Sequence, residues 1–373
     1  MRSRCGRSVR GLMAVAVLTA CVALTGCGPF FIAESSTTSS SSDLIYVANA
    51  TTATLSGYVI GTGTMTAITS TPLALAYVPQ ALVVTRPNTF LYVAGPSAVY
   101  LYTIATDGVL TADGAAAYSD VVSLDVSPDG NWLVGLDAAS ELLDIWQINT
   151  STGALTTEAS ASYSISNATV SPKMVRFSPS GSYLFAALGT GGDVVFTFNT
   201  STGVAASSQV LSTGSTSTSD NALAVDSTTS TLYIARSGTT TGVAVYTIGS
   251  AGALTAVSGS PFAAGTTPYA VAIDSTGTYV YAANRTDGTI SGFTIGTGSV
   301  LTALSSSPYS SGTLVTALAT DNSGSYLFAV ANGGSPDLTM YSYDSTTSGK
   351  LDTIAAVTTG TDPTGAIAIA ATH

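Results

Sequence analysis

The sequence predicts an all-β protein, a seven-bladed β-propeller built from four-stranded antiparallel blades. Three observations lead to this prediction. A strand pattern recurs seven times at a spacing of about 47 residues, which is the length of a propeller blade. Glycine-containing turns separate the strands of each repeat. The chain also enters and leaves the repeat at an offset, so that its two ends can complete a single blade and close the ring.

The first residues are typical of an export signal. Four arginines lie within residues 1–10, and residues 11–23 are apolar. This apolar stretch is too short for a comfortable membrane span but suits a secretory signal peptide. It ends in Leu24-Thr25-Gly26-Cys27, a string that resembles the lipobox of bacterial lipoproteins. The resemblance implies cleavage after residue 26 and attachment of lipid to Cys27. The alternative is an ordinary cleaved signal followed by a chance cysteine.

A tether is expected between the signal and the propeller. Residues 35–42 are all Ser or Thr, a composition that buries nothing and stays flexible. The predicted organisation is therefore a signal peptide at 1–26, a Ser/Thr-rich tether at 27–42 and a propeller at 43–373. The protein is expected to be exported and anchored by its lipid to the cell envelope, on the periplasmic or the outer surface.

Each repeat contains two strands that are easily recognised, named B and C here. Strand B opens with an aliphatic residue that is followed by an aromatic or similar residue. These pairs are Ile45-Tyr46, Leu91-Tyr92, Leu133-Val134, Leu184-Phe185, Leu232-Tyr233, Val280-Tyr281 and Leu327-Phe328. Strand C carries an aromatic residue within an alternating pattern, which is the period-two signature of a strand. Its aromatic positions are Tyr58, Tyr102, Trp146, Phe196, Tyr246, Phe293 and Tyr341.

Turns then locate the outer strand D and the inner strand A. A Gly-rich or Thr-Gly turn follows every strand C and leads into strand D. A Pro-Asp-Gly-like turn, such as Ser127-Pro128-Asp129-Gly130, joins strand A to most B strands. The propeller begins at a strand B (44–48) and ends at a strand A (365–370), so the last strand is expected to join the first blade. The middle position of strand A is mostly small, as the propeller axis requires. It reads Val83, Asp125, Arg176, Ala224, Ala272, Ala319 and Ala368.

The composition argues against several classes of function. After removal of the signal, six Lys and Arg face 21 Asp and Glu, a net charge of −15. Such an acidic surface repels phosphate backbones and argues against nucleic-acid binding. The three cysteines all precede the propeller, and the single histidine is His373. Cysteine-based metal sites and histidine-centred triads are therefore not expected. The sequence predicts no cofactor and no metal, and favours a monomer.

With the repeats aligned, residues 254–265, 268–274 and 281–284 resemble the blade repeat of the lactonase-type and Tyr-Val-Thr-Asn-type propellers. The resemblance covers 43–373. It implies an active face at the B–C and D–A loops, with histidine, arginine and acidic groups, as in 6-phosphogluconolactonase and a muconate-cyclising enzyme. Residues 284–290 resemble the Ser-Asn-Arg loop of that branch, and 172–179 resemble its histidine-containing inner strand. In this chain Lys173 replaces the histidine, and Ala187 replaces an aspartate.

Several charged residues are candidates for a site. Arg285 and Arg236, expected in B–C loops of one face, could hold a carboxylate or an oxyanion, or bond nearby carbonyls or Asp287. Lys173 could clamp a substrate or be a solvated loop lysine. These three are the candidate catalytic residues.

A second group holds the candidate ligand-binding residues. Asp125 and Arg176 could line the mouth of the channel or form a structural ion pair between blades. The remaining members are Asn284, Asp287, Asp137 and Asp193. No calcium-loop spacing is present among the acidic residues, which disfavours a metal site.

Three functions remain open from the sequence. The first is a binding module without turnover, whose partner on the B–C/D–A face would be a protein, a polysaccharide or a small lactone. The second is a lactone hydrolase that acts on a lactone outside the cytoplasm, with Arg285, Arg236 and Lys173 at its site. The third is a purely structural repeat protein of the envelope. The predicted membrane contact in each case is the lipid on Cys27.

Overall fold

The computed structural model describes residues 43–165, 169–359 and 365–373. The predicted signal peptide, Cys27 and the tether lie outside the described residues. Within the described part of the chain, no helix has the length and apolar character needed to cross a membrane.

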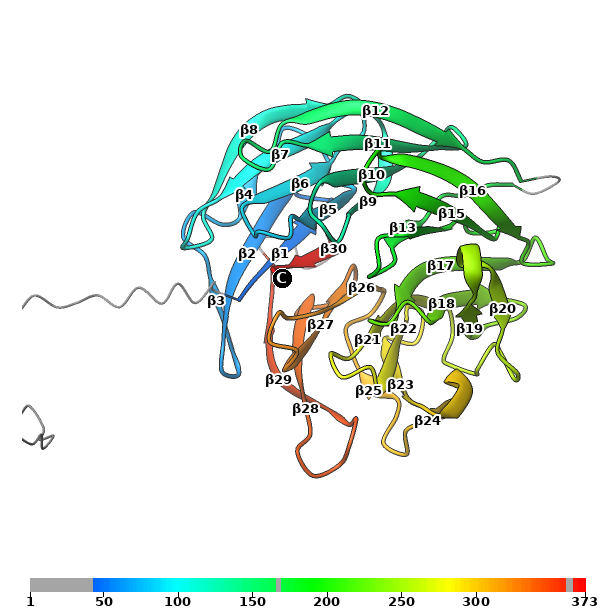
Figure 1. Ribbon diagram of the computed structural model, residues 1–373. Helices are drawn as coiled ribbons and strands as arrows, with labels where there is room; N and C mark the ends of the chain where they lie inside the picture. Colours follow the sequence, from blue (N-terminus) through cyan, green and yellow to red (C-terminus); the bar gives the residue numbers. More distant parts are fainter. Residues whose placement is uncertain (1–42, 166–168, 360–364) are drawn as a thin grey trace, which may run out of the picture. The chain divides into compact units, whose positions relative to one another are not determined.

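The described residues form seven antiparallel sheets arranged around an axis, as predicted (Figure 1). Blade 1 contains β1 (Leu44–Asn49), β2 (Thr54–Gly61), β3 (Thr64–Ala67), β4 (Leu73–Ala74) and β30 (Ala366–Ala371). Blade 2 contains β5 (Ala81–Val84), β6 (Phe90–Ala94), β7 (Val99–Ile104) and β8 (Leu110–Ala117). Blade 3 contains β9 (Val121–Val126), β10 (Trp132–Asp137), β11 (Leu142–Ile148) and β12 (Leu155–Ser162).

The remaining blades follow the same plan. Blade 4 contains β13 (Met174–Phe177), β14 (Tyr183–Ala187), β15 (Asp193–Asn199) and β16 (Val204–Leu211). Blade 5 contains β17 (Thr218–Val225), β18 (Thr231–Gly238), β19 (Gly242–Ile248), η1 (Ser250–Gly252) and β20 (Leu254–Ala256). Blade 6 contains β21 (Pro268–Ile273), β22 (Tyr279–Asn284), β23 (Thr289–Ile295), η2 (Thr297–Ser299), β24 (Leu301–Ala303) and β25 (Tyr309–Ser310). Blade 7 contains β26 (Val315–Thr320), β27 (Tyr326–Ala331), β28 (Leu338–Tyr343) and β29 (Leu351–Val357).

Two blades differ slightly from the predicted four strands. In blade 1 the short strand β4 pairs with β2, and in blade 6 the short strand β25 pairs with β23. Both extra strands follow a short outer strand, β3 or β24, which covers only part of the strand C beside it. The following loop therefore pairs with the part of strand C that the outer strand leaves open.

The ring closes as the offset of the repeats predicts. Strand β30 from the end of the chain pairs antiparallel with β1, and Tyr46 lies opposite Ala370. The main-chain N–H of Leu44 donates to Thr372 Oγ1 at 2.9 Å, and the N–H of Thr372 donates to the carbonyl of Leu44 at 2.9 Å. Because every described strand lies within 44–371, we expect residues 43–373 to fold without the preceding segment.

Aromatic side chains fill the wedges between neighbouring blades. Tyr46, Tyr92 and Tyr281 are fully buried in strand B of their blades. Each hydroxyl donates to the carbonyl of a glycine in the C–D turn of the following blade, as in the 2.8 Å bond from Tyr46 to Gly108. Burying an aromatic ring contributes about 1.5–3 kcal/mol, and the hydroxyl bond satisfies its polar end. The recurrent aromatic positions of the repeat are therefore packing residues between blades.

We expect Gly203→Ala to lower the free energy of unfolding by about 2 kcal/mol. The alanine would adopt an unfavourable positive φ, and its Cβ would clash with an aromatic ring. Gly203 has a φ of +68°, and an added Cβ would lie 2.3 Å from the ring of Trp132 in the neighbouring blade. Gly63 provides a matched control, since its φ is also +68° but no atom lies within 4 Å of the added Cβ. Gly63→Ala should show the backbone cost alone. Equal losses for the two variants in urea unfolding would contradict the packing argument.

Candidate functional site

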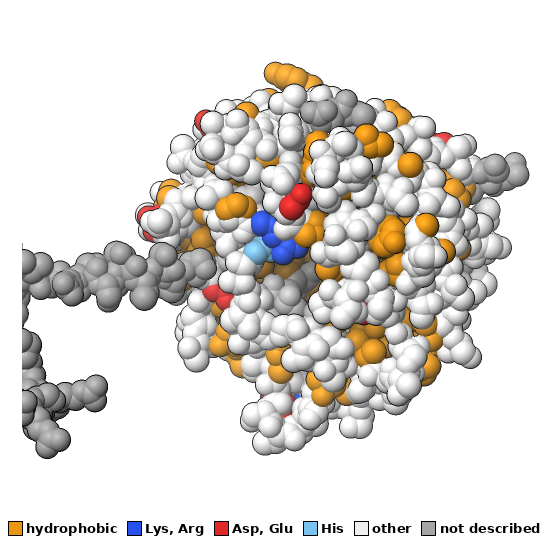
Figure 2. All heavy atoms as spheres, in the orientation of Figure 1, with side chains coloured by type: hydrophobic (Ala, Val, Ile, Leu, Met, Phe, Trp, Pro, Cys, Tyr) orange, Lys and Arg blue, Asp and Glu red, His pale blue; other side chains and the backbone are white. Residues whose placement is uncertain are grey.

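A cavity of about 1010 Å³ follows the propeller axis and is lined by the inner strands of the blades. Its upper mouth, as defined here, carries the B–C and D–A loops, where the A strands begin. Its lower mouth carries the A–B turns, where the A strands end. Figure 2 shows the face that bears the single histidine of the chain, with a depression at its centre.

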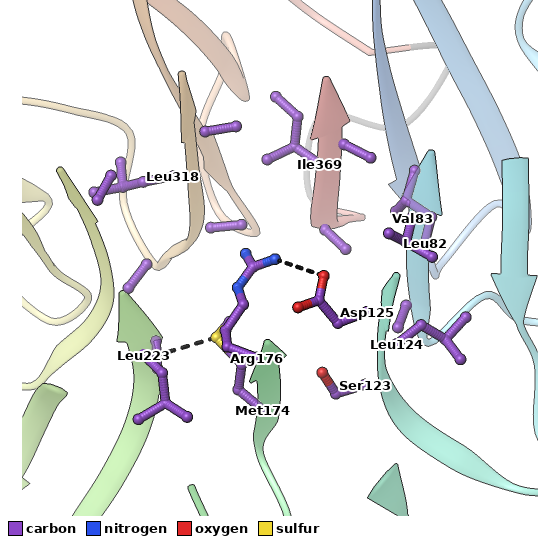
Figure 3. Close-up of a pocket in the computed structure, with 18 of the residues that line it drawn as sticks. Leu82, Val83, Ser123, Leu124, Asp125, Met174, Arg176, Leu223, Leu318 and Ile369 are labelled. Atoms are coloured by element: carbon purple, nitrogen blue, oxygen red, sulfur yellow. Dashed lines mark hydrogen bonds and ion pairs between the residues drawn. The ribbon is translucent and has the colours of Figure 1, made fainter. Parts of the chain in front are cut away.

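Polar side chains cap the inner edges of the A strands, whose N–H groups have no further strand to pair with. Ser123 accepts the N–H of Val175 at 3.1 Å, and Asp125 accepts the N–H of Phe177 at 2.7 Å. In the same way the sulfur of Met174 accepts the N–H of Leu223 at 3.2 Å (Figure 3). Each cap comes from the preceding blade, so these side chains fasten one blade to the next.

Asp125 and Arg176 form an ion pair between blades 3 and 4, and Figure 3 shows the guanidinium of Arg176 lying within the cavity. The distance between Nη1 of Arg176 and Oδ1 of Asp125 is 3.4 Å, longer than a strong charge-assisted hydrogen bond. The side chain of Arg176 is 43% exposed. Asp125 is therefore held mainly by the backbone that it caps, whereas Arg176 keeps donors available to the cavity.

Lys173 and Arg285 lie at the upper mouth. Lys173 directly precedes β13, and Arg285 directly follows β22, as predicted for a B–C loop residue. Both side chains line the cavity. The guanidinium of Arg285 lies over the ring of Tyr269, 4.4 Å from its centroid, which orients the cation without neutralising it. Among the described residues neither cation forms an ion pair, so the structure brings both candidates to one mouth.

Asn284 and Asp287 hold the neighbouring D–A loop. Oδ1 of Asn284 accepts the N–H of Gly265 at 3.0 Å, and Oδ2 of Asp287 accepts the N–H of Thr266 at 2.6 Å. The amide nitrogen of Asn284 also donates to the hydroxyls of Thr289 and Ser291 in β23. Their hydrogen bonds are thus used to shape the loop beside Arg285.

The predicted position of Arg236 in a B–C loop is wrong. Arg236 belongs to β18, and its side chain is 9% exposed. Its Nε and Nη2 donate to the two carboxylate oxygens of Asp220 at 2.6 and 2.8 Å, and Nη2 also donates to Tyr246 Oη at 3.2 Å. Strand B of blade 5 extends past the point where the other blades turn, because β18 pairs with β17 as far as Gly238. Arg236 is consequently absent from the cavity lining.

Asp193 lies beside this buried pair. It is the first residue of β15, and both its carboxylate oxygens are buried with no hydrogen-bond partner in the described part of the chain. The nearest contact to Arg236 is 3.9 Å, because the guanidinium is directed at Asp220. Burial raises the pKa of Asp193 well above its ordinary value, the charge of Asp220 raises it further, and Arg236 lowers it. Arg236 is therefore paired with Asp220, and Asp193 holds its proton more tightly than a solvent-exposed aspartate does.

The raised pKa of Asp193 leads to a pH-dependent prediction. Asp193 binds its proton more tightly in the folded than in the unfolded protein, so its contribution to stability falls as the pH rises above about 4. The Asp193→Asn variant cannot lose a proton and can donate an N–H to Asp220. We therefore expect the variant to gain stability over the wild type progressively as the pH rises above about 4. Urea unfolding at several pH values tests this, and a constant difference would rule out a protonated Asp193.

Asp137 is the last residue of β10 and shapes the loop that follows. Its carboxylate accepts the main-chain N–H groups of Ala139 and Ser140 at 2.8 and 2.5 Å. Among the described residues there is no group of three or more His, Cys, Asp or Glu side chains that could hold a metal. Asp137 is therefore a loop cap in this structure.

Two residues that sequence reasoning did not select line the lower mouth. Arg86 follows β5, and His373 follows β30. Neither belongs to a recognisable motif, and only the position of each two residues after an inner strand could have indicated its place.

Comparisons with known proteins agree with the fold. A family model described as "Lactonase, 7-bladed beta-propeller" matches residues 119–317, more than half of the chain. The periplasmic gluconolactonase PpgL of Pseudomonas aeruginosa has a similar structure, with 16% identity, a TM-score of 0.70, and 89% of this chain and 99% of that chain covered. A protein from Lactobacillus plantarum gives 15% identity, a TM-score of 0.72, and 89% and 100% coverage. No match was found among curated protein sequences.

Proposed function

The chain belongs to the lactonase family of seven-bladed β-propellers, and from this premise we propose that it is a non-catalytic binding module of the cell envelope. The module binds a carboxylate-bearing ligand, such as a sugar acid or an acidic polysaccharide, at the upper mouth. Lipid on Cys27 anchors it, and the Ser/Thr-rich tether carries the propeller away from the membrane.

The observation that carries this proposal is the pair of cations at the upper mouth. Lys173 and Arg285 line the cavity without an ion-pair partner among the described residues. A guanidinium binds a carboxylate through two parallel hydrogen bonds, and an ammonium adds a flexible point charge. In a chain with a large excess of acidic residues, two free cations at one mouth favour an anionic ligand.

The arrangement of acid and base groups argues against turnover. Hydrolysis of a lactone needs a base to activate water in addition to an electrophile. The carboxylates and the imidazole that line the cavity belong to Asp125, Asp321 and His373. All three come from the ends of A strands, at the lower mouth. Lys173 and Arg285 come from the opposite end of the cavity.

Lactone hydrolysis is the second candidate function. It is favoured by the similarity to the protein from Pseudomonas aeruginosa, which is named a periplasmic gluconolactonase. Lys173 and Arg285 would then stabilise the oxyanion formed at the lactone carbonyl. The water-activating base would have to come from solvent or from the ligand, so this activity would be slow.

Calorimetric titration of residues 43–373 with gluconate and with oligogalacturonates tests the binding function. We expect saturable binding that weakens at least about tenfold in Arg285→Ala and in Lys173→Ala, a loss of roughly 1.4 kcal/mol or more. Lys350→Ala serves as the matched control, because Lys350 pairs with Asp344 and Asp352 outside the cavity. A lactone panel is measured in parallel. Hydrolysis that depends on Arg285 would replace the binding function by the hydrolase, and no binding of any acid would reject the proposal.

A further inference from the structure

Cations gather along the cavity far more than the composition suggests. Residues 43–373 contain six Lys and Arg. Four of them line the cavity, namely Arg86, Lys173, Arg176 and Arg285. The other two, Arg236 and Lys350, are paired with aspartates elsewhere. Lys173 and Arg285 belong to the upper mouth, which leaves Arg86 and Arg176 unexplained.

Three nitrogen-bearing side chains meet at the lower mouth from three different blades. Arg86 follows β5 of blade 2, Arg176 lies near the end of β13 of blade 4, and His373 follows β30 of blade 1. In Figure 2 Lys or Arg side chains lie directly beside the histidine, at the centre of the face. Burial and the charge of Arg86 lower the pKa of His373, the Val84 carbonyl and the charge of Asp125 raise it, and the charge of Arg176 lowers it; the net shift is downward. The imidazole therefore lies within the field of both guanidinium groups.

The A–B turn of blade 2, the next blade of the ring, fixes the position of His373. Its main-chain N–H donates to Asn88 Oδ1 at 2.8 Å, and its main-chain oxygen accepts the Asn88 amide at 2.8 Å. The ring nitrogen Nε2 lies 3.2 Å from the carbonyl of Val84. The remaining ring nitrogen, Nδ1, has no partner among the described residues, and it can donate to an anion when the imidazole is protonated.

The carboxylates at this mouth are already engaged. Asp125 caps Phe177 and pairs with Arg176, and Asp321 accepts the N–H of Tyr326 at 2.7 Å. Asp43, the first described residue, lies beside Asp321. Burial and the contact with Asp321 raise the pKa of Asp43 to about 6. No carboxylate forms an ion pair with Arg86 among the described residues.

We propose that the lower mouth is a second anion site, which binds a phosphate group between Arg86, Arg176 and His373. A planar carboxylate is satisfied by a single guanidinium fork, whereas a tetrahedral phosphate presents oxygens in several directions at once. Donors that approach from three blades match the second geometry. This site lies at the opposite end of the cavity from the proposed carboxylate site and does not depend on it.

The phosphate could be free or belong to a lipid headgroup. The chain enters the propeller at Asp43 on this same face, where the N–H of Asn322, a residue of the cavity lining, donates to Asp43 Oδ1 at 3.2 Å. A tether from lipid-modified Cys27 would thus join the face that carries the phosphate site. Both sources present the same chemistry, and the experiment distinguishes them.

The single histidine of residues 43–373 makes the test direct, since it gives one set of imidazole signals in the NMR spectrum. Titrations are run in sodium chloride, in sodium acetate and in sodium phosphate of equal ionic strength. A bound phosphate offsets the positive field of the two arginines, so we expect the pKa of His373 to rise by about one unit in phosphate only. Arg86→Gln should abolish the rise, and Lys350→Gln should leave it unchanged. Equal pKa values in the three salts, or a rise with acetate of the same size, would overturn the proposal.

Sedimentation with vesicles identifies the source of the phosphate. Residues 43–373 are mixed with phosphatidylglycerol vesicles and with neutral vesicles of phosphatidylcholine. Binding to the anionic vesicles that is lost in Arg86→Gln would assign the site to a lipid headgroup. A phosphate-dependent change in the pKa of His373 without vesicle binding would assign it to a soluble phosphate. If the vesicles bind equally well with and without Arg86 and the pKa does not move, no phosphate site exists at the lower mouth.

Discussion

Replacing Arg236 by methionine is expected to lower the free energy of unfolding by about 3–5 kcal/mol, the cost of leaving a buried carboxylate without its counter-ion. Arg236 donates through two nitrogens to the carboxylate of Asp220, which is fully buried. Methionine fills much of the same volume but offers no donor. The loss therefore measures the missing hydrogen bonds and charge rather than a cavity. Urea unfolding at pH 7 provides the measurement.

A double variant separates the cost of an unpaired charge from the value of the pair. In Arg236→Met/Asp220→Leu both charges are gone, and buried ion pairs are often replaced by apolar groups with little loss. We expect this variant to recover most of the stability that the single variant loses. Lys350→Met, in a solvent-exposed pair, should change stability very little. A double variant as unstable as Arg236→Met would show that shape, not charge, governs this position.

The misplacement of Arg236 shows where the sequence pattern stops being informative. In most repeats strand B ends just after its stretch of buried apolar residues. Applied to blade 5, this pattern predicts that the strand ends before Arg236 and that Arg236 lies in a loop. The extension of β18 depends on pairing with β17, including a register shift between Asp220 and Ala222. That shift is a tertiary feature, and no periodicity in the sequence reports it. Arg285 was placed correctly because Asn284 ends its strand, as the repeat implies.

The fold was more predictable than the site for a physical reason. Blade strands are specified seven times over, by alternation along each strand and by glycines at turns that need a positive φ. Each of the seven C–D turns has a glycine with a φ between +68° and +83°, namely Gly63, Gly108, Gly153, Gly203, Gly252, Gly298 and Gly349. A site such as the lower mouth uses one residue from each of several blades. Arg86 and His373 become neighbours only when β30 closes the ring, so nothing local in the sequence connects them.

Closure of the ring also yields the second large effect. Deleting residues 366–373 removes β30, and we expect this variant to lose its cooperative unfolding transition at room temperature. Strand β1 would expose an unpaired inner edge along five paired positions, and the buried residues that β30 covers would meet water. A domain of this kind is stable by only about 5–15 kcal/mol. Each hydrogen bond between β30 and β1 contributes about 0.5–1.5 kcal/mol, and the apolar contacts of β30 add to this. Losing all of them removes most of the free energy of unfolding.

A circular permutant tests whether the strand itself or its position in the chain matters. The new chain begins at Val78 and ends at Tyr77, and a short Gly-Ser linker joins His373 to Asp43, whose neighbours Thr372 and Leu44 are hydrogen-bonded at 2.9 Å. All strands of blade 1 then follow one another in the chain, but the ring closes only through side-chain packing between blades 1 and 2. We expect the permutant to fold cooperatively with a lower melting temperature than the wild type, whereas the deletion does not fold.

A deletion variant that melts like the wild type would show that the pairing of β30 with β1 contributes nothing, and the offset of the repeats would need another explanation. If instead the permutant is as stable as the wild type, side-chain packing between blades suffices to close the ring, and the shared blade is a consequence of where the repeats begin.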